Sequence, residues 1–587
     1  MKLSRYLPVL DWGRRYSRHT LVNDLVAALI VTIMLIPQSL AYAMLAGLPL
    51  QVGLYASILP LIVYAVFGTS RTLAVGPVAI LSLMTAAAAG RIAEPGSALY
   101  IEAALILAIL AGVILLVMGV FRMGFLANFL SHPVVSGFIT ASGLIIAASQ
   151  LKHIMGVDAS GHNLLELLIS LGRQLPQIHV PTLAIGGSSL VFLFWARSQL
   201  KPLLTRLGLN TRLATIIARA GPVFAVVASI LAVALLQLDE VGVRILREVP
   251  TDLPRLSVPS LDPAIWQQLI GSAALIALIG FVESVSVAKT LAAKRRQSVD
   301  PDQEMIGLGM SSLAAGLSSG YPVTGGLARS AVNFDAGAET PAAGAFTAIG
   351  IALATLFLTP FLFFLPQAVL AATIIVAVLS LVDLAAIRQV FVYSRTDFAA
   401  MVVTIGLTLA FGVELGVSAG VVLSLVLHLY NTSRPHFARV GIVPGTHHFR
   451  NEDRHDVILS KSVLILRVDE SLYFANARFL EDMVYQEIHD RPDIRHLVLM
   501  CPAVNAIDAS ALESLEAINL RLKESGIALH LSEVKGPVMD RLERTHFLDE
   551  LTGRVFLHQY EALEALDPDC AFSARHAPDG RALDYHI

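Results

Sequence analysis

Long apolar runs fill most of the chain between residues 20 and 431, and short polar or glycine- and proline-containing segments separate them. An apolar run of about 20 residues is long enough to cross a bilayer as a helix. The pattern predicts about fourteen transmembrane segments in two sets of seven. The first set lies near 20–45, 50–67, 76–90, 98–121, 131–151, 178–197 and 213–237. The second set lies near 266–292, 302–319, 327–338, 343–361, 366–384, 397–411 and 413–431.

After about residue 434 the pattern changes to short apolar runs that alternate with amphipathic segments. The runs VLILRV (463–468) and HLVLM (496–500) predict strands, and helical patterns follow near 476–490, 509–525 and 536–545. This alternation indicates a small α/β domain. The predicted parts are an N-terminal segment (1–19), a membrane domain (20–433, with internal repeats of about 20–238 and 260–431), a linker (434–456), an α/β domain (457–570) and a C-terminal tail (571–587).

The composition supports a polytopic membrane protein. Of 587 residues, 55% are apolar and only 15% are charged, and these proportions are far from those of a soluble domain. The net charge of −3 gives no reason to expect a nucleic-acid partner. Both cysteines, Cys501 and Cys570, lie in the polar C-terminal part, which argues against a disulfide framework and for a reducing cytosol around it.

The distribution of lysine and arginine predicts the orientation in the membrane. The polar N-terminus is basic, and alternate loops, such as 197–212 and 293–297, are rich in these residues. Because cytoplasmic loops carry an excess of lysine and arginine, the N-terminus and the C-terminal domain are predicted to be cytoplasmic. We expect a multi-pass protein of the cell (inner) membrane.

Because each set has an odd number of spans, seven, the second set begins on the opposite side of the membrane from the first. This is the geometry of an inverted repeat. Two sequence echoes support it. The first span of each set carries polar residues in its middle, in IPQSLAYAMLAG (36–47) and GFVESVSVAK (280–289). The third span of each set begins at a glycine-containing break, in LAVGPVAILSLM (73–84) and YPVTGGLARSAV (321–332).

These two breaks predict an anion site inside the membrane. Broken backbone at that depth is tolerated only within protein or beside a water-filled cavity. Gly76-Pro77 and Gly325-Gly326 would each let the chain turn into a helix, and in an inverted repeat the two helix N-termini would face each other. Two helix ends of roughly +0.5 each, together with Arg329, give about +2 charges for an anion. The alternative is that Arg329 neutralises Glu283 or caps backbone carbonyls.

Glu283 is the other costly residue, because it lies in the middle of the eighth predicted span. An ionised carboxylate would lower the charge of the site to about +1, and a protonated one would restore about +2. A dianion would therefore prefer the protonated protein, which provides a route to proton-coupled uptake. The alternative is a structural ion pair between Glu283 and Arg329.

Several motifs resemble those of the SulP family of sulfate permeases and related anion transporters. They are PQSLAYAMLAGLPLQVGLYAS (37–57), GTSRTLAVGPVAILSLM (68–84), FLSHPVVSGF (129–138), SQLKHIMG (149–156), DPDQEMIGLG (300–309) and, in 320–333, GYPVTGG followed after Leu327 by ARSAVN. The resemblance covers roughly residues 10–570. It implies fourteen transmembrane segments as a seven-plus-seven inverted repeat with a core and a gate domain. It also implies elevator-like alternating access, a homodimer and a cytosolic STAS domain at the C-terminus.

By position, the resemblance implies which residues contact the substrate. They are Gln38, Tyr42, Val78, Ala79, Leu327, Ala328 and Arg329. For Gln38 and Tyr42 the alternative is hydrogen bonding between helices. Many relatives have a serine where this chain has Ala328, so one hydroxyl contact to the ligand is missing.

The resemblance also bears on the coupling ion. Glu283 matches the acidic position of the family on the eighth span, which is Glu in proton-coupled members and Asp in the sodium-coupled bicarbonate branch. That branch holds sodium partly with hydroxyl side chains, and Leu327 and Val287 occupy those neighbourhoods here. Because neither side chain offers an oxygen ligand, the sequence favours protons.

Within the α/β domain, VNAIDASALESL (504–515) resembles the loop-to-helix motif of STAS domains. In regulatory relatives a phosphorylated serine directly follows the aspartate of this motif. Here Ala509 follows it, which leaves Ser510 as the regulatory candidate. The alternative is that Ser510 and Glu513 form a capping box at the start of the helix. We expect the domain to bind a cytosolic protein partner or to act as a scaffold.

The leading hypothesis is a secondary active transporter of small inorganic anions, with proton-coupled sulfate uptake first. The alternatives are a bicarbonate or C4-dicarboxylate transporter, an anion exchanger or channel on the same fold, and a membrane-tethered sensor that signals through its STAS domain. The sequence contains no HExxH, GxSxG, P-loop or GxGxxG motif and no clustered His and Cys. We therefore expect no enzymatic activity, no cofactor and no metal site.

Overall fold

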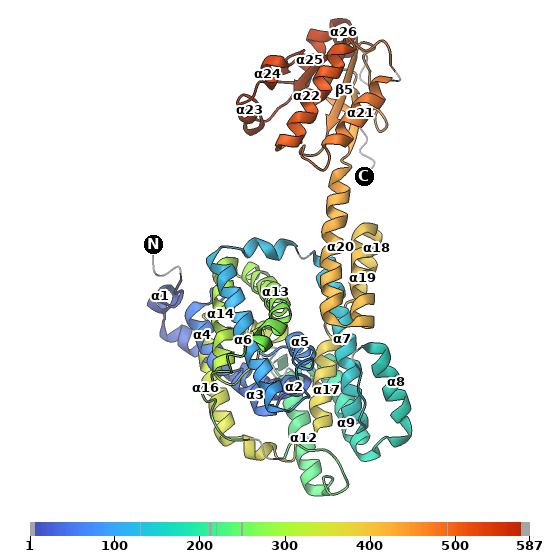
Figure 1. The fold of residues 1–587 in the computed structure, drawn as a ribbon. Coiled ribbons are helices and arrows are strands. Elements are labelled where there is room, and N and C mark those ends of the chain that lie inside the picture. The colour runs from blue at the N-terminus through green and yellow to red at the C-terminus, as the bar shows by residue number, and fades with distance from the viewer. Residues whose placement is uncertain are drawn as a thin grey trace. The chain divides into compact units, whose positions relative to one another are not determined.

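Figure 1 shows the fold as a computed structural model, which describes residues 6–576 apart from 130, 162, 211–213, 216, 219, 248–249 and 490. The chain divides into two compact units, Met1–Ser424 and Leu425–Ile587. The first unit is almost entirely helical, and the second contains a six-stranded sheet. The division falls inside one long helix, α20 (Val413–Ser433), because its first turns pack within the helical unit.

Every predicted span corresponds to a helix or to a pair of helices. Those of the first set are α2 (Arg18–Leu45), α3 (Leu50–Tyr55) with α4 (Leu59–Phe67), α5 (Ala79–Ala89), α6 (Ala98–Val120), α7 (His132–Met155), α9 (Val180–Trp195) and α12 (Gly221–Leu236). Those of the second set are α13 (Pro263–Lys294), α14 (Pro301–Leu317), α15 (Leu327–Ala336), α16 (Ala342–Phe357), α17 (Gln367–Leu379), α19 (Arg395–Phe411) and α20. Among the described residues, eight helices are long and apolar enough to cross a membrane. The count of fourteen spans therefore stays a prediction.

Among the residues that the structure describes, four α-helices of the first unit lie outside the predicted spans. They are α1 (Val9–Trp12), α8 (Leu164–Gln174), α10 (Lys201–Arg206) and α18 (Leu384–Tyr393). The helix α8 is amphipathic and packs on α7 through Leu167 and Leu171. Its polar face interrupts the apolar pattern, so a search for apolar runs passes over it.

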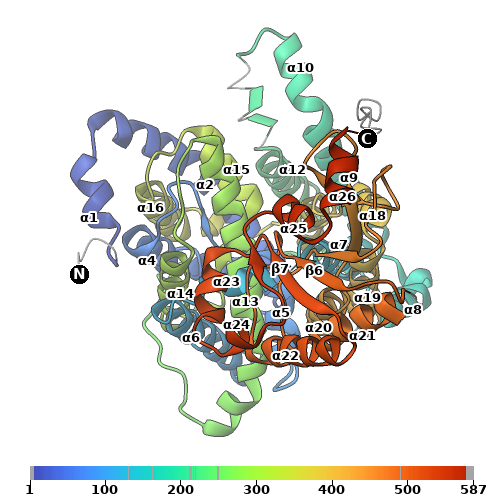
Figure 2. The same cartoon turned by 90° about the horizontal axis from the view of Figure 1, so that it is seen from above.

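The helices of the first unit form two bundles, which Figure 2 shows side by side. One bundle contains α2, α4, α6, α13, α14 and α16, and the other contains α7, α9, α12, α17 and α19. Small residues let helices approach closely within a bundle: a Cβ atom added to Gly309 of α14 would lie 2.9 Å from the carbonyl oxygen of Gly112 on α6. Such backbone contact is typical of helices that associate within membranes.

A polar contact joins the two bundles at Glu414, in the first turn of α20. This helix packs on α19 and α7, because a Cβ atom on Gly420 would contact both Thr404 and Val134. The Glu414 Oε2 atom lies 2.6 Å from Nη2 of Arg91, which follows α5. Its Oε1 atom accepts a 2.7 Å hydrogen bond from the hydroxyl of Ser272 on α13. Glu414 thus connects α20, which packs on the second bundle, to α13 of the first bundle and to the segment that follows α5.

The second unit is a sheet with helices on both faces. Its strands are β3 (Phe437–Ile442), β4 (Phe449–Asn451), β5 (Val463–Val468), β6 (His496–Met500), β7 (Ala528–Ser532) and β8 (Val555–Phe556), in the order β4-β3-β5-β6-β7-β8. The strands β5 to β8 run parallel, and β3 pairs antiparallel with β4 and β5. The helices are α21 (Ala477–His489), α22 (Ala509–Glu524), α23 (Gly536–Leu542), α24 (Phe547–Glu550), α25 (Gln559–Leu566) and α26 (Pro568–His576).

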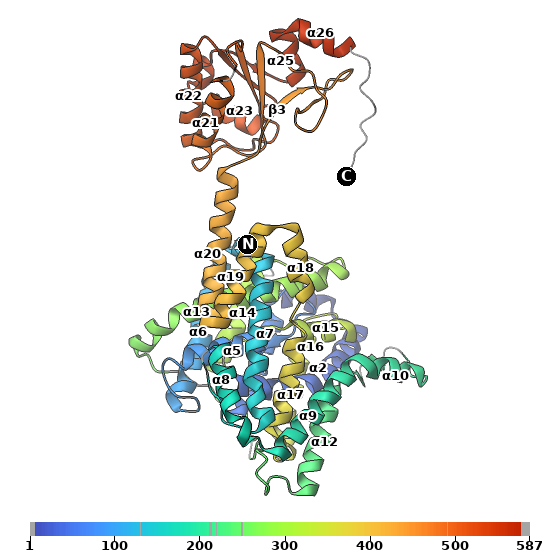
Figure 3. The same ribbon diagram turned by 90° about the vertical axis from the view of Figure 1, so that its right-hand side faces the viewer.

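Alternation along the strands explains why both faces of this sheet are covered. Leu464 and Leu466 of β5 pack with α21 and α22, whereas Val463 and Ile465 pack with α25 and α26. Figure 3 shows these two helix pairs on opposite faces. The predicted strands 463–468 and 496–500 are confirmed residue for residue. A parallel strand covered on both faces reads as a continuous apolar run, which is the pattern that predicted them.

Three sequence-based expectations for this unit differ from the structure. The segment 434–456, predicted as a linker, contains β3 and β4, whose polar flanking residues obscured the strand pattern. The first residues of the predicted tail 571–587 belong to α26, and its remaining residues lie outside the described part of the chain. The capping-box interpretation of Ser510 is wrong, because Asp508 is the N-cap of α22 and accepts a 2.9 Å hydrogen bond from the Ala511 N–H. Ser510 is an exposed residue in the first turn.

Candidate functional site

Two very short strands bring together parts of the membrane domain that are far apart in the sequence. Strand β1 (Val75–Gly76) pairs antiparallel with β2 (Thr324–Gly325), and Val75 lies opposite Gly325. The N–H of Gly326 donates to the carbonyl oxygen of Ala74 at 3.3 Å. The pairing satisfies backbone groups that lipid could not satisfy. It also aligns the two chain breaks that the sequence indicated.

A helix follows each strand directly, and no side chain caps either one. Helix α5 begins at Ala79 after Val78, and α15 begins at Leu327 after Gly326. The first N–H groups of a helix have no partner within it, and the helix dipole places partial positive charge there. The two uncapped starts therefore present backbone donors at the end of the strand pair.

Both helix starts line a cavity of about 520 Å³ between the two bundles. Glu283 of α13 lines this cavity. So do all the substrate-contact residues that the sequence predicted, which are Gln38, Tyr42, Val78, Ala79, Leu327, Ala328 and Arg329. The opposite wall comes from α9, α17 and the turn of π-helix at Ala196–Leu200. The cavity is of the size expected for a small-molecule site.

The guanidinium group of Arg329 is buried at this cavity without a full set of partners. Arg329 is only 2% exposed, and its Nη1 atom forms no hydrogen bond. Its Nη2 atom donates only a long bond, 3.4 Å, to the Thr324 carbonyl oxygen. Cβ atoms on Gly76 and Gly326 would lie 2.8 Å and 3.0 Å from its nitrogens, so these glycines make room for it. A buried unpaired cation is costly and indicates a ligand that completes the site.

Glu283 also has an unused polar atom at the cavity. Its Oε2 atom is buried and accepts no hydrogen bond. Among the described residues, no ion pair joins Glu283 to Arg329. The two groups therefore face one cavity as separate charges, and the structural ion pair considered from the sequence is not formed.

Gln38 and Tyr42 lie on α2, after the helix-interior residue Pro37. Both side chains are half-buried at the cavity, and neither donates or accepts a hydrogen bond with the part of the chain that the structure describes. The alternative that they hold helices together is therefore not supported by their contacts. Leu327 and Ala328 are exposed to the cavity, and they contribute an apolar edge and backbone N–H groups.

Sequence reasoning missed the hydroxyl residues that hold the strands in place. Ser284, next to Glu283 on α13, accepts a 2.8 Å bond from the Gly325 N–H, and its hydroxyl lies 2.5 Å from that of Thr324. Thr324 in turn donates to the Gly280 carbonyl at 2.6 Å. On α15, Ser330 accepts a 3.0 Å bond from the Ala74 N–H. The sequence signal that could have found them is the position of Thr324 directly before the glycine pair and of Ser284 directly after Glu283.

A buried carboxylate on α14 holds the loop that enters β1. Glu304 accepts hydrogen bonds from the Tyr64 hydroxyl (2.8 Å), the Thr69 N–H (2.8 Å), the Thr69 hydroxyl (2.5 Å) and the Ser70 N–H (2.8 Å). Such a satisfied carboxylate fixes its surroundings. Glu304 is thus a positioning residue, and it contrasts with Glu283, which has no such partners.

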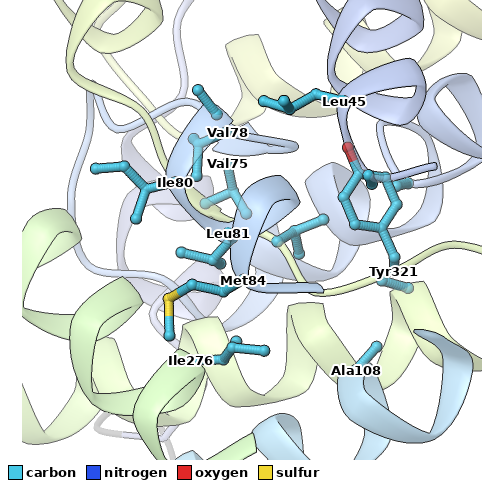
Figure 4. Close-up of a cluster of buried hydrophobic side chains, with 14 of the residues drawn as sticks. Leu45, Val75, Val78, Ile80, Leu81, Met84, Ala108, Ile276 and Tyr321 are labelled. Carbon is cyan, nitrogen blue, oxygen red and sulfur yellow. The ribbon is translucent and has the colours of Figure 1, made fainter. Parts of the chain in front are cut away.

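Apolar packing supports the site from behind. In Figure 4, Leu81 and Met84 of α5 face Ile276 of α13 within one buried cluster. Tyr321, just before β2, is fully buried in the same cluster, and its hydroxyl lies 3.0 Å from that of Ser82 on α5. The start of α5 is therefore held rigidly against β2 and α13. Within the described residues there is no group of three or more His, Cys, Asp or Glu side chains that could hold a metal ion.

The comparisons with known proteins agree with this geometry. The profile of the sulfate permease family matches residues 21–404. The chain is also 35% identical, over 95% of its length, to probable sulfate transporter 4.2 of Arabidopsis thaliana, of which it covers 83%. This chain belongs to the sulfate permease family. A STAS domain matches residues 455–562, so the α/β unit of this sulfate permease family member is a STAS domain.

Other relatives span a wide range of organisms. A probable sulfate transporter of Mycobacterium tuberculosis is 32% identical over 94% of this chain and 96% of its own length. Among solved structures, that of SLC26A9 has the same fold, with a TM-score of 0.88 at 23% identity over 96% of this chain and 93% of that one. The transmembrane domain of the cyanobacterial bicarbonate transporter BicA matches 70% of this chain and 98% of its own, with a TM-score of 0.58 at 18% identity. This family member is thus a multi-pass membrane anion transporter and not an enzyme.

Proposed function

We propose that the protein takes up small inorganic anions, sulfate first, together with protons, by an elevator-type alternating-access mechanism. The observation that carries the proposal is the buried Arg329 guanidinium, which has an unpartnered Nη1 atom between two uncapped helix starts. The cavity provides about +2 charges if Glu283 is neutral. A dianion would supply the acceptors that these donors lack.

Sulfate fits the types of donor that line the cavity. Its oxygens point in tetrahedral directions, so one ion can accept from backbone N–H groups of both helix starts and from a guanidinium at the same time. The Gln38 amide and the Tyr42 hydroxyl offer further donors, because neither is used within the described protein. The names of the relatives from Arabidopsis and Mycobacterium support sulfate as the first substrate to test.

Glu283 is the proposed proton-coupling group. Its buried carboxylate lines the substrate cavity and lacks hydrogen-bond partners, so its charge acts directly on the bound anion. A proton on Glu283 would remove one negative charge from the site and favour a dianion. The hydroxyls of Ser284 and Thr324 are of the type that can bind a sodium ion, but here they are engaged with each other and with backbone groups.

We also propose the cell (inner) membrane as the location, with the N-terminus and the STAS domain in the cytoplasm, a homodimer as the assembly, and a cytosolic protein partner for the STAS domain. The basic loops support the orientation. Ser510, exposed in the first turn of α22, stays the regulatory candidate, since a phosphate there would meet the positive end of the helix.

Uptake by the purified protein tests the transport proposal. In proteoliposomes, we expect saturable uptake of labelled sulfate that rises when the outside is made more acidic than the inside. Excess unlabelled sulfate should compete better than bicarbonate or a C4-dicarboxylate. If bicarbonate or the dicarboxylate competes more strongly than unlabelled sulfate does, that anion and not sulfate is the preferred substrate. Currents that do not saturate and do not respond to a proton gradient would instead indicate a channel.

The contact between Arg91 and Glu414 allows a test of the elevator movement, because it joins the two bundles. We expect the double variant Arg91→Cys/Glu414→Cys, made in a Cys501→Ser/Cys570→Ser background, to take up sulfate when reduced. Cross-linking the two thiols with a bifunctional methanethiosulfonate reagent, which spans more than a direct disulfide, should lower uptake at least tenfold, and reduction should restore it. The two single-cysteine variants are the controls. Full uptake by the cross-linked protein would contradict relative movement of the bundles.

A further inference from the structure

A second large cavity, of about 790 Å³, shares no lining residue with the anion cavity. The N-terminal segment, the loop before β1, the turn after α6 and the turn between α13 and α14 surround it. The lining residues on which the argument depends are Asp11, Trp12, Arg71, Arg122, Arg296 and Asp300. These turns lie at the predicted cytoplasmic end of the membrane domain.

Three arginines from three different turns converge on this cavity: Arg71, Arg122 and Arg296. None of their side chains forms an ion pair or a hydrogen bond with the part of the chain that the structure describes. The two aspartates that also line the cavity are already engaged. Asp11 lies 3.5 Å from Arg15, and Asp300 accepts the N–H groups of Asp302 and Gln303 at the start of α14. Asp300 has no cationic partner among the described residues, so three arginines face one uncompensated carboxylate and the cavity keeps an excess of positive charge.

The backbone at two of these arginines is unusual. Arg122 has a φ of 56° and Arg296 a φ of 53°, in the left-handed region that L-residues other than glycine rarely adopt. Each follows the end of a helix, where glycine is the preferred residue. An arginine at such a position is strained, and strained residues cluster at functional sites. The positive-inside rule explains why cytoplasmic loops carry arginine. It does not explain why two of these arginines have strained backbone or why all three line one cavity.

A tryptophan with an unused donor also lines the cavity. The indole Nε1 atom of Trp12, on α1, is buried and has no hydrogen-bond partner. The segment that carries Trp12 is held in place, because the Gln303 amide donates to the Tyr6 carbonyl at 3.2 Å and to the Phe67 carbonyl at 2.8 Å. The cavity thus offers three guanidinium groups, which are donors only.

From this geometry we propose a second binding site, which takes a phosphate group. Arginine forks bind phosphate oxygens in pairs, and phosphate carries the negative charge that this cavity lacks. At about 790 Å³ the cavity is larger than the anion cavity, and it has room for a phosphate group that belongs to a larger molecule, either an anionic lipid headgroup or a soluble phosphomonoester. Bound there, it would join α1 to the loop at 69–72, which leads into β1.

Binding to the purified full-length chain tests the proposal. One arm uses nanodiscs of phosphatidylcholine with or without a phosphoinositide, and the other uses glycerol phosphate added to the protein in phosphatidylcholine alone. The variants are Arg71→Gln/Arg122→Gln/Arg296→Gln and a control with the same loss of charge, Arg14→Gln/Arg173→Gln/Arg388→Gln. All measurements are repeated with Arg329→Ala, which removes binding at the anion cavity.

We expect the native protein and the control variant to bind one of the two probes, and the triple variant of the cavity to bind it at least tenfold more weakly. Binding in the first arm only identifies a lipid headgroup, and binding in the second arm identifies a soluble phosphate compound. A further variant, Arg122→Gly/Arg296→Gly, should lose binding while its thermal stability stays equal or rises, because glycine relieves the left-handed strain. Equal binding by native and cavity variants, or binding of neither probe by the native protein, would overturn the site.

Discussion

Replacing Arg329 by alanine is expected to abolish measurable sulfate uptake and to weaken sulfate binding by about tenfold to a hundredfold. A hydrogen bond to a charged group contributes about 1.5–3 kcal/mol, and about 1.4 kcal/mol corresponds to a factor of ten in affinity. The variant also removes the full positive charge of the site and leaves only the two helix starts. Binding of labelled sulfate to the purified protein, measured beside uptake into proteoliposomes, would give both effects.

The stability of the same variant separates a ligand-binding role from a structural one. Because Nη1 of Arg329 is buried without a partner, the alanine variant should unfold at the same or a higher temperature than the native protein in the absence of sulfate. A residue that held the strands together would instead cause a clear loss of stability. Sulfate should raise the unfolding temperature of the native protein but not that of the variant.

Two further variants sharpen this test. Arg329→Lys keeps the charge but not the planar fork, so binding should fall between that of the native protein and that of the alanine variant. Arg388→Ala is a matched control, because Arg388 is exposed on α18 and lines neither large cavity. If Arg329→Ala binds sulfate as tightly as Arg388→Ala does, the guanidinium is not part of the substrate site.

The sequence predicted most of the helices and strands because they depend on local pattern. Apolar runs located the membrane helices to within a few residues, as in α6 (Ala98–Val120) against the predicted 98–121. The strand pattern of the STAS domain was equally local. Elements with mixed polarity, such as the amphipathic α8, were missed because membrane depth and tertiary packing, not their own composition, determine them.

The strand pair β1–β2 could not be predicted as a pair. Each strand has two residues, and their register joins Val75 to Gly325 across most of the membrane domain. Only the glycine breaks, together with the inverted-repeat argument, indicated that the two segments would meet. The burial of Arg329 was predictable from its position, whereas its lack of partners depends on side-chain geometry that no pattern encodes.

Capping and anchoring contacts show the same limit of local pattern. Ser510 and Glu513 have the spacing of a capping box, but Asp508 is better placed because it also accepts the Phe474 N–H from another segment at 2.9 Å. Likewise, Glu304 and Glu283 are both acidic residues in apolar helices. Only the structure distinguishes the one that is fully hydrogen-bonded from the one that is free to face a ligand.

Replacing Glu283 by glutamine is expected to make sulfate uptake independent of the proton gradient. The substitution keeps the size of the side chain and removes its ability to carry a negative charge. At an effective dielectric constant of about 20, one unit charge at 4 Å changes the energy of another by about 4 kcal/mol, and proportionally less at greater distance. A dianion feels twice that effect, so the charge state of this carboxyl should dominate the pH dependence of binding.

The expected pattern of results is specific. In the native protein, sulfate should bind more tightly and enter faster as the outer pH falls, because protonated Glu283 leaves the positive charge of the cavity uncompensated. In Glu283→Gln, binding should stay tight at every pH, exchange of sulfate for sulfate should continue, and an inward proton gradient should no longer accelerate net uptake. Glu102→Gln is the control, since Glu102 lies outside the cavity and, within the described residues, accepts only the Ser260 N–H. A pH dependence in Glu283→Gln equal to that of the native protein and the control would mean that another group carries the proton, while the anion site at Arg329 would remain as proposed.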